Sequence, residues 1–456
     1  MAFTSPRRVR PLLIPLVLIY VLAQLAVAPL PAWASRLDTD VIYGKAASAQ
    51  AGLADVDRPD ITARNAIILG KDGVSYFERD ADAPVKIASI TKVMTAIVAI
   101  ENAQPTDIIT VDHAAATVGQ SSAHLKEGDS MPLSVALKAL MIPSGNDAAM
   151  AIAVSVGRII DPASPDPYGV FIAKMNETAK RIGMSNSVFT NPHGLDFGGW
   201  EGELHSTARD VATMFKYAMA NEQFRAMEAD SANNVITVRG ADGADRSLTL
   251  KPHNMVFNTA GNIGGKTGST YEALSCFVGA YSRELGGEIY VVNLGSETDG
   301  ARWTDTLAMA NWYYDHWVNY PLATSSKKSA AGDPLVARVS HTDWSDKTVD
   351  AVLADPSRAV ALFSLAGEVT QTVDVHDVSG TVTQGEELGT VTLEQGGKTL
   401  ATEKVVAAES QASPDWPQWF MVQFDRLVRL VHGEPAQAKT ETLLETPKAT
   451  DIDAAA

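Results

Sequence analysis

The sequence is poor in the residues that build disulfides and metal centres. Among its 456 residues there are one cysteine, Cys276, and nine histidines. One thiol cannot form an internal disulfide, and the apolar neighbours of Cys276 favour a buried strand position over a reactive one. No histidine lies near a cysteine or a carboxylate at the spacing of metal ligands. We therefore expect neither a metal site nor a cofactor.

Positive charge is also scarce. The chain has 54 acidic and 37 basic residues, which gives a net charge of −17. Such an excess of negative charge argues against nucleic acid as a partner and provides no general attraction to an anionic wall or lipid surface. If the protein binds a carboxylate, a few local cations must do so.

The N-terminal residues 1–34 have the pattern of an export signal. Three arginines precede an apolar run at 12–28, and Pro29 and Pro31 then break any helix. The small-x-small pattern A-W-A at 32–34 favours cleavage at its end. The alternative is an uncleaved membrane anchor, because the apolar run is nearly long enough to span a bilayer.

The composition of the remaining chain changes several times, which indicates more than one domain. Strand-like runs at both ends of the main domain enclose a helical middle, which predicts an α/β (α+β) fold with an antiparallel sheet built from both ends. Its last helix is expected from Trp303 to Tyr320, and a hairpin in the β-domain is expected to turn at Gly396 and Gly397. The expected segments are a flexible lead-in (35–60), a main domain (61–322), a linker (323–334), a small β-domain (335–410), an amphipathic helix (413–432) and a disordered acidic tail (433–456).

The string S-I-T-K, from Ser89 to Lys92, can provide a nucleophile and its base. Residues three apart on a helix share a face, so the Lys92 amine can reach the Ser89 hydroxyl. A serine hydroxyl needs such a base, and lysine can serve only if its pKa falls well below about 10.4. Burial and a second cation both lower that pKa, and Lys266 can be the second cation. Taken alone, this string is more often a serine at a helix start followed by an exposed lysine.

Two further strings offer complementary groups. S-G-N, from Ser144 to Asn146, follows a helix break at Pro143; its hydroxyl can pass on a proton and its amide can orient a carbonyl and the base lysine. K-T-G, from Lys266 to Gly268, is expected on a strand or at the following turn. Lys266 and Thr267 can hold a carboxylate there, and Gly268 permits close approach of a peptide backbone. Helix capping and a glycine-rich turn are the plain alternatives.

The three strings, in this order and behind an export signal, resemble those of the low-molecular-mass penicillin-binding proteins that act as serine D-alanyl-D-alanine carboxypeptidases. The likeness extends to L-M-I-P-S-G-N-D-A-A and N-P-H-G-L-D, and it covers roughly residues 64–320. A fainter likeness at 360–409 matches the family's C-terminal β-domain. The resemblance implies the fold shared by penicillin-binding proteins and β-lactamases, with an antiparallel sheet and a helical subdomain, followed by a small all-β domain and a C-terminal amphipathic helix.

The resemblance also implies a role for each site residue. Ser89 would attack the peptide bond between the last two D-alanines of a peptidoglycan stem peptide, and β-lactam antibiotics would acylate the same hydroxyl. Lys92 would accept its proton, and Ser144 would relay a proton to the departing D-alanine. His193, in N-P-H-G-L-D, is expected to be structural. The full expected set is Ser89, Lys92, Ser144 and Asn146 for catalysis, and Lys266, Thr267, Gly268, Ser269 and Arg302 for the substrate, with backbone N–H groups of Ser89 and Ser269 as the oxyanion hole.

The segment 416–431 has apolar and aromatic residues at helical spacing and arginines on the other side. It is too short and too polar to span a bilayer of about 30 Å, and its pattern fits a helix lying in the membrane interface. The alternative is a helix whose apolar side packs on the β-domain. The resemblance favours the membrane, which would place the exported protein on the extracytoplasmic face of the bacterial cell membrane, peripherally anchored by this helix.

Two other functions remain open at this stage. A β-lactamase uses the same acylation but clears the acyl-enzyme with a glutamate-activated water. An inactive relative could serve as a cell-wall scaffold. Endopeptidase activity on cross-links is a variant of the carboxypeptidase reaction, because both reactions break a bond that follows a D-alanine.

Overall fold

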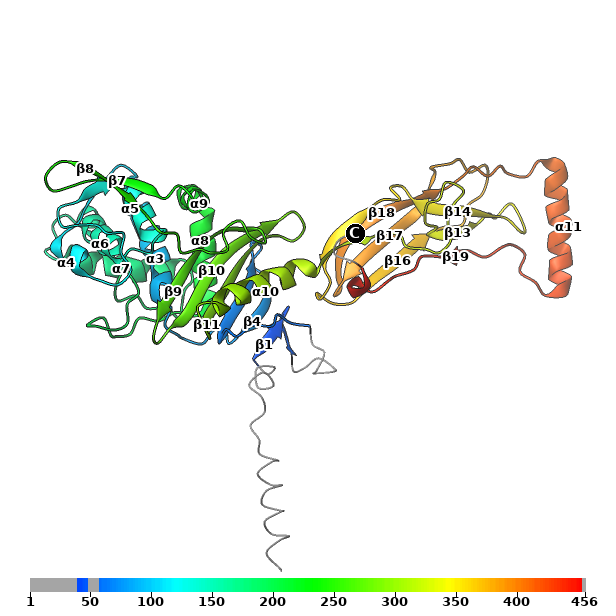
Figure 1. Ribbon diagram of the computed structural model, residues 1–456. Coiled ribbons are helices and arrows are strands. Elements are labelled where there is room, and N and C mark those ends of the chain that lie inside the picture. Colours follow the sequence, from blue (N-terminus) through cyan, green and yellow to red (C-terminus); the bar gives the residue numbers. More distant parts are fainter. Residues whose placement is uncertain (1–38, 48–56, 453–456) are drawn as a thin grey trace, which may run out of the picture.

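The computed structural model describes residues 39–47 and 57–452 (Figure 1). The expected export signal at 1–34 lies outside these residues. Within them, the chain forms a seven-stranded sheet with helices, and then a β-rich C-terminal part that carries one separate helix at its far end (Figure 1).

The main sheet is antiparallel and is built from both ends of its domain, as predicted. The N-terminal strand β3 pairs with the late strand β11, and the strand order is β2-β1-β4-β3-β11-β10-β9. Strand β9 therefore forms one edge. The strands are β1 (Asp40–Ile42), β2 (Lys45–Ala46), β3 (Asn65–Gly70), β4 (Ser75–Arg79), β9 (Asn262–Thr270), β10 (Leu274–Arg283) and β11 (Gly287–Ser296).

Both faces of the sheet are buried, which explains the continuous apolar runs of its central strands. Along β3, Ile67 belongs to the core shared with the helical part, whereas Ala66 and Ile68 face the core shared with helix α10. This alternation is the two-residue period of a strand. Helix α10 (Ala301–Asp315) thus covers one face, and the helices between β4 and β9 cover the other (Figure 1).

The helical part surrounds helix α3, which directly follows a short 3₁₀ segment. Residues Lys92–Ala99 of α3 are all buried, as expected of a helix packed on every side. A small four-stranded sheet lies beside the helices. The elements are η4 (Ala88–Thr91), α3 (Lys92–Asn102), α4 (His113–Thr117), α5 (Leu133–Met141), α6 (Asn146–Ile160), α7 (Pro167–Arg181), α8 (Ala208–Ala220), α9 (Glu222–Ala229), β5 (Ile108–Thr110), β6 (Ser130–Pro132), β7 (Val235–Arg239) and β8 (Asp245–Thr249).

The expected helix from Trp303 to Tyr320 is wrong at its end. Helix α10 stops at Asp315, and β12 (Trp317–Pro321) follows and pairs with β15 (Ala359–Phe363). Val318 and Tyr320 alternate with less buried neighbours and enter the core of the C-terminal part. The two-residue period of this short run outweighs helical continuity. This pair therefore joins a strand before the expected linker at 323–334 to a strand that follows it.

The C-terminal part holds a six-stranded antiparallel sheet in the order β16-β17-β18-β14-β13-β19. The predicted hairpin is confirmed: β17 and β18 join at Gly396 and Gly397, whose φ angles of 57° and 81° suit a type I′ turn. The strands are β13 (Ala337–Ser340), β14 (Thr348–Leu353), β16 (Val369–Val375), β17 (Glu387–Gln395), β18 (Lys398–Ala407) and β19 (Glu441–Thr442).

The expected disorder of the acidic tail at 433–456 is wrong over its described residues. Strand β19 pairs with β13, and the Tyr320 hydroxyl donates a 2.7 Å hydrogen bond to Pro447 O. Ala449, in the 3₁₀ segment η5 (Ala449–Asp451), is buried, and Leu444 packs against the same core. An unpaired strand edge and a few aliphatic side chains order this segment despite its polar composition.

The expected flexibility of the lead-in at 35–60 is likewise wrong where the structure describes it. Strand β1 pairs with β4, and Asp40 is fully buried. Its carboxylate accepts hydrogen bonds from Arg79 at 2.6 and 2.8 Å and from Arg58 at 2.5 Å. A buried, doubly bonded ion pair therefore attaches the start of the domain to the sheet.

Helix α11 (Trp416–His432) confirms the expected C-terminal helix. It begins with a capping box between Asp415 and Gln418 and ends at Gly433, which has a φ of 72°. It lies at the end of the β-rich part away from the seven-stranded sheet (Figure 1). Over 39–47 and 57–452, no helix is both long and apolar enough to cross a membrane.

We predict that Asp40→Asn lowers the free energy of unfolding by about 3–5 kcal/mol, because it leaves the buried Arg79 guanidinium without its counter-charge. Calorimetry or urea unfolding would measure the change. Glu387→Gln, which removes one partner of the exposed pair with Lys404, is the control and should leave stability nearly unchanged. Equal effects of the two substitutions would contradict a stabilising role for the buried pair.

Candidate active site

The first string places a lysine amine beside a serine hydroxyl at the start of the central helix. Ser89 lies in η4, and Lys92 begins α3. Lys92 Nζ lies 2.8 Å from Ser89 Oγ, 2.7 Å from Asn146 Oδ1 and 3.0 Å from the carbonyl oxygen of His193. The structure therefore brings together Ser89, Lys92 and Asn146, which are separated by up to 57 positions in sequence but were expected in one site.

The environment of Lys92 favours its neutral form. The side chain is fully buried, and burial is the main reason that its pKa falls well below the ordinary value. Repulsion by the Lys266 ammonium lowers the pKa further, and the Asp147 carboxylate opposes this only in part. This direction agrees with the lowering expected from burial and a second cation.

The second string forms a strained loop between α5 and α6. Ser144 has a φ of 60°, a left-handed conformation that a non-glycine residue adopts at some cost. The Asn146 amide bridges two segments: Oδ1 contacts Lys92, and Nδ2 donates a 2.9 Å hydrogen bond to Gly119 O. Asp147 accepts hydrogen bonds from Ser122 Oγ and from backbone N–H groups of the loop that contains Ser122. The loop around 119–125 is thereby fixed beside the site.

The third string lies on the edge strand β9. Lys266 is buried, and its Nζ donates hydrogen bonds of 2.8 Å to Ser144 Oγ and 2.9 Å to Thr267 O. Burial lowers the pKa of Lys266 to about 7, with the Glu228 carboxylate opposing and Arg302 adding to the shift. Lys266 thus joins the second and third strings through one hydrogen bond.

Position 268 requires glycine for packing within the protein, in addition to the expected approach of a substrate backbone. A Cβ at this position would collide with Ile87 O, in the segment that leads to Ser89. Strand β9 and η4 pack directly against each other at this point. The glycine therefore allows the K-T-G strand to approach the serine, whatever is bound at the strand edge.

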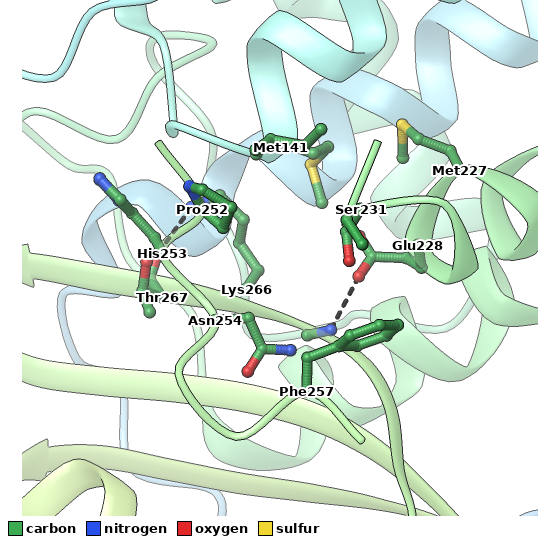
Figure 2. Close-up of a pocket in the computed structure, with 13 residues that line it drawn as sticks. Met141, Met227, Glu228, Ser231, Pro252, His253, Asn254, Phe257, Lys266 and Thr267 are labelled. Atoms are coloured by element: carbon green, nitrogen blue, oxygen red, sulfur yellow. Dashed lines mark hydrogen bonds between the residues drawn. The ribbon is translucent and has the colours of Figure 1, made fainter. Parts of the chain in front are cut away.

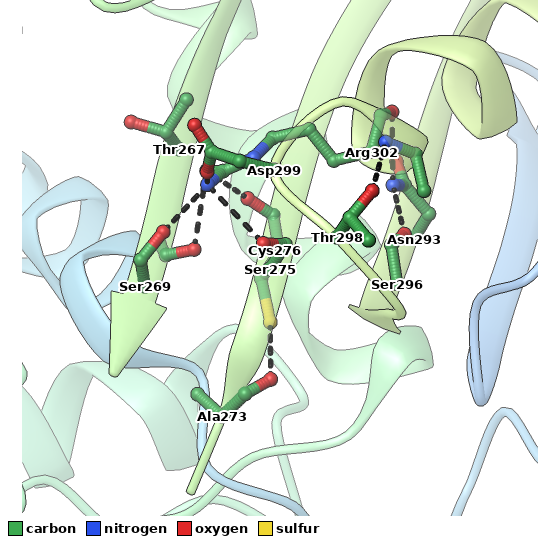
Figure 3. Close-up of polar contacts among 12 residues, drawn as sticks. Thr267, Ser269, Ala273, Ser275, Cys276, Asn293, Ser296, Thr298, Asp299 and Arg302 are labelled. Atoms are coloured by element: carbon green, nitrogen blue, oxygen red, sulfur yellow. Dashed lines mark hydrogen bonds and ion pairs between the residues drawn. The ribbon is translucent and has the colours of Figure 1, made fainter. Parts of the chain in front are cut away.

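Arg302 reaches from the first turn of α10 to the end of the K-T-G strand (Figure 3). Its Nη2 donates a 2.6 Å hydrogen bond to Ser269 Oγ and also contacts the Asp299 carboxylate. Its Nη1 donates 3.3 Å bonds to Gly268 O and Cys276 O. The guanidinium is thus placed beside Ser269 by contacts to strands β9 and β10.

The three strings and Arg302 meet at one cleft of about 350 Å³. Ser89, Ser144 and Thr267 line it, with Ser269 and Arg302 at one side. Lys92, Asn146 and Lys266 lie buried around it and contact its serines. Its other lining residues are Ser121, Lys251, Pro252, His253, Met255, Asp299 and Trp303. A cleft with two serine hydroxyls, each bonded to a buried lysine, can support nucleophilic catalysis on a substrate that carries a carboxylate.

The backbone of His193 takes part in the site, but its ring faces elsewhere. The ring nitrogen Nδ1 accepts a 3.2 Å hydrogen bond from Leu195 N, and the ring packs edge-on against Trp200 at 4.5 Å. Burial and the nearby Lys92 lower the pKa of His193 to about 3, so the ring is neutral. This geometry agrees with the structural role expected for the residue.

Sequence reasoning missed Glu228, whose carboxylate Oε2 accepts a 2.8 Å hydrogen bond from Gly265 N, directly before Lys266. A signal was present. Phe224, Met227 and Glu228 have the i, i+3, i+4 spacing of one helix face, and all three are buried. A glutamate on an apolar helix face indicates a buried carboxylate that needs a partner.

Comparison with known proteins was consistent with this geometry. The family model for D-alanyl-D-alanine carboxypeptidases matches residues 53–298. The D-alanyl-D-alanine carboxypeptidase DacF of Bacillus subtilis is 26% identical over 359 residues, which cover 76% of this chain and 85% of that protein. DacB2 of Mycobacterium tuberculosis is 30% identical over 259 residues, covering 56% of this chain and 83% of that protein.

A solved structure shows the same fold. The crystal structure of the Streptomyces K15 DD-transpeptidase matches with a TM-score of 0.51 and 30% sequence identity, covering 56% of this chain and 98% of that one. The part of the chain that carries the cleft therefore has the α/β fold of the penicillin-binding transpeptidases.

We predict that Lys266→Met raises the pKa of Lys92 toward its ordinary value, because it removes the like charge that disfavours the Lys92 ammonium. NMR titration of the ¹³Cε signals of isotope-labelled lysine would follow the change. Lys404→Met, a surface lysine in the C-terminal sheet, is the matched control and should leave the titration of Lys92 as it is. An unchanged Lys92 pKa in Lys266→Met would show that burial acts alone.

Proposed function

Because this chain belongs to the D-alanyl-D-alanine carboxypeptidase family of penicillin-binding peptidases, we propose that it is a serine D,D-carboxypeptidase. It removes the terminal D-alanine from peptidoglycan stem pentapeptides. The observation that carries the proposal is the 2.8 Å contact between Lys92 Nζ and Ser89 Oγ, at a cleft that also holds Ser144, Thr267 and Arg302. The chemistry requires a nucleophile with its base and, beside them, cations and hydroxyls for a carboxylate.

The first step is attack by Ser89. A neutral Lys92 amine has two N–H groups and one lone pair. The two N–H groups can be used by Asn146 Oδ1 and His193 O, at 2.7 and 3.0 Å, which leaves the lone pair for the Ser89 hydroxyl. Ser89 Oγ then bonds to the carbonyl carbon of the penultimate D-alanine, and its proton passes to Lys92.

The developing charge and the leaving group need further partners. Backbone N–H groups of Ser89 and Ser269 stabilise the oxyanion, and the loss of one such donor typically costs roughly 10²–10³ in rate. Ser144 Oγ then relays the proton that Lys92 accepted to the departing nitrogen as the C–N bond breaks, which returns Lys92 to its neutral form; Lys266 is bonded to the Ser144 hydroxyl at 2.8 Å. Water then hydrolyses the Ser89 ester and releases the shortened peptide. A β-lactam acylates Ser89 by the same attack, with its ring amide in place of the peptide bond.

The substrate carboxylate sets the position of the peptide. Lys266, Thr267, Ser269 and Arg302 surround the end of the cleft that would receive it. Strand β9 is the edge of the sheet, so an extended stem peptide can add alongside it through main-chain hydrogen bonds. In this protein of net charge −17, attraction of the anionic substrate end is therefore local to these few cations.

The cleft favours this reaction over the two alternatives. Among the described residues that line it, Asp299 is the one carboxylate, and it is paired with Arg302. No glutamate is thus in place to activate water as in a β-lactamase. A scaffold would have no need of two buried lysines bonded to serines, since burying them is costly. Endopeptidase cleavage of cross-links uses the same groups and remains a variant of the proposal.

We also propose that helix α11 lies on a membrane surface. Its orientation is the reverse of an ordinary surface helix: Arg426 donates hydrogen bonds to Thr342 O and Trp344 O, whereas the apolar side faces outward. This exposure argues against the alternative that the apolar side packs on the β-domain. The exposed apolar residues are Trp416, Trp419, Phe420, Met421, Phe424, Leu427, Val428, Leu430 and Val431.

Such a surface fits the boundary between lipid headgroups and acyl chains. Arg426 and Arg429 are engaged by the β-domain and by Asp425. Binding would therefore depend on apolar burial more than on anionic lipid. Together with the export signal expected at 1–34, α11 would hold the enzyme on the extracytoplasmic face of the cell membrane.

We predict that Ser89→Ala abolishes covalent labelling by a fluorescent penicillin and lowers D-alanine release from a pentapeptide by at least roughly a thousandfold, because no other group forms the acyl bond. Gel fluorescence and mass spectrometry of the products would measure both. Ser357→Ala, at an exposed turn, is the control and should label as the wild type does. D-alanine release that survives in Ser89→Ala would remove Ser89 as the nucleophile.

For the membrane, we predict that Phe420→Glu combined with Leu427→Glu weakens flotation with phosphatidylcholine vesicles at least roughly a hundredfold, since two apolar side chains no longer enter the interface. The chain should begin at residue 35 so that the apolar run at 12–28 cannot bind. Ile108→Glu combined with Val235→Glu is matched in charge and in exposure (59% and 56%, against 63% and 58%) and should float normally. Equal flotation of both double variants would defeat the anchor proposal.

A further inference from the structure

A second cavity, of about 200 Å³, lies next to the active-site cleft (Figure 2). The two share Pro252, His253 and Thr267 as lining residues. The cavity is lined largely by apolar side chains such as Met141 and Phe257, but besides the shared His253 it also contains two ionisable groups, Glu228 and Lys266. The mechanism proposed above uses Lys266 and gives no role to Glu228.

Glu228 is held against the backbone of the K-T-G strand. It lies on α9, is 5% exposed, and accepts the 2.8 Å hydrogen bond from Gly265 N. Figure 2 shows its carboxylate pointing toward this N–H. Helix α9 can approach β9 this closely because position 264 is glycine: a Cβ there would lie 2.8 Å from both Glu228 Cβ and Oε2. The carboxylate is therefore fixed beside the backbone that carries Lys266.

The two ionisable groups depend on each other. A carboxylate and an ammonium that are both buried are costly unless each compensates the other. Burial raises the pKa of Glu228 to about 7, and the hydrogen bond from Gly265 N–H and then the charge of Lys266 oppose this rise in part. Burial lowers the pKa of Lys266 to about 7, and Glu228 opposes that shift.

The other charged groups around Lys266 act against its charge or not at all. Arg302 lowers the pKa of Lys266, and Lys92 is coupled to Lys266 by repulsion. His253 has its pKa lowered to about 4 by burial and by nearby cations, so its ring is neutral near pH 7. The Asp147 carboxylate raises the pKa of Lys92, and it is not among the groups that shift the pKa of Lys266. Among the described residues, Glu228 is thus the carboxylate that favours a charged Lys266.

We propose that Glu228 is a positioning residue for the K-T-G strand: its buried carboxylate, fixed by Gly265 N–H, keeps Lys266 charged so that it can bind the substrate carboxylate. This inference rests on the proposed function. In this proposal, the two lysines need opposite protonation states. Lys92 must be neutral to accept a proton, whereas Lys266 must be charged to attract the substrate and to repel a proton from Lys92. A carboxylate close to Lys266, and separate from Lys92, allows both conditions to hold at one pH.

The test is the pH dependence of Ser89 acylation by a labelled penicillin in Glu228→Gln. The substituted amide keeps the shape of the side chain and can still accept the Gly265 hydrogen bond, so the substitution removes only the charge. Without the carboxylate, the pKa of Lys266 falls. The alkaline fall in the acylation rate should therefore begin at a pH about one unit lower than in the wild type. Above that pH, the variant should acylate roughly tenfold more slowly than the wild type. The acid limb, which reports Lys92 while Lys266 is still charged, should stay in place.

Two controls separate charge from structure. Glu222→Gln makes the same change at an exposed position of the same helix and should reproduce the wild-type profile. A penicillin whose carboxylate is esterified should lose less rate in Glu228→Gln than the free acid does, because it offers no anion to Lys266. With the pentapeptide, KM should rise more than kcat falls.

The outcomes are distinct. An unchanged alkaline limb in Glu228→Gln overturns the inference, and so does an equal loss at every pH with a lower melting temperature, which would indicate packing alone. If the wild-type protein is not labelled at any pH, the proposed function itself fails, and the role of Glu228 in it fails for that separate reason.

Discussion

Two buried lysines facing one pair of serines organise this site. Lys92 and Lys266 are both almost completely inaccessible to solvent, and each contacts a serine hydroxyl at 2.8 Å. Two ammonium groups in so small and dry a volume repel each other strongly, so one of them gives up its proton far more easily than in water. The pattern of partners determines which one. Lys92 is hydrogen-bonded to two neutral oxygens, from Asn146 and His193, and the Asp147 carboxylate offsets its burial and the repulsion by Lys266 only in part, whereas Lys266 has the Glu228 carboxylate nearby.

The fold brings these groups together by pairing the ends of the domain. Strand β3 lies before the helical part and β11 after it, and their pairing brings β9 and η4 into contact through β10. The approach is close enough that position 268 must be glycine. The loop between α5 and α6 presents the Ser144 hydroxyl to Lys266, and Ser144 has a left-handed φ of 60° there.

In the C-terminal part, the main feature is the way in which helix α11 is attached. The loop between β13 and β14 holds helix α11 by its polar side, and the chain after the helix returns to pair as β19 with β13. Both ends of the helix are therefore attached to the sheet, and the apolar side is left facing outward. A short helix fixed in this way presents its aromatic residues together, which suits a flat apolar partner better than a single flexible tail would.

Local sequence was sufficient for much of this protein. The spacing of Ser89 and Lys92, the break at Pro143, the glycine turn at 396–397 and the apolar stripe of α11 each follow from periodicity or from backbone preference within a few residues. The three strings and their order were also enough to predict the fold and the expected site. For the helix starts, the break and the hairpin, the physical cause lies within one helical turn or one turn of the chain; for the fold and the site, it was the order of the three strings and the family they resemble that carried the prediction.

The remaining features depend on neighbours far away in the chain. The free edge of β15 decided that residues 317–321 form a strand and do not continue the helix. The free edge of β13 decided that the tail is ordered. The side of α11 that faces the sheet follows from the carbonyls of Thr342 and Trp344. The link between Glu228 and Lys266 arises only when α9 packs on β9. Burial and charge–charge distance set these outcomes, and both are properties of the folded arrangement.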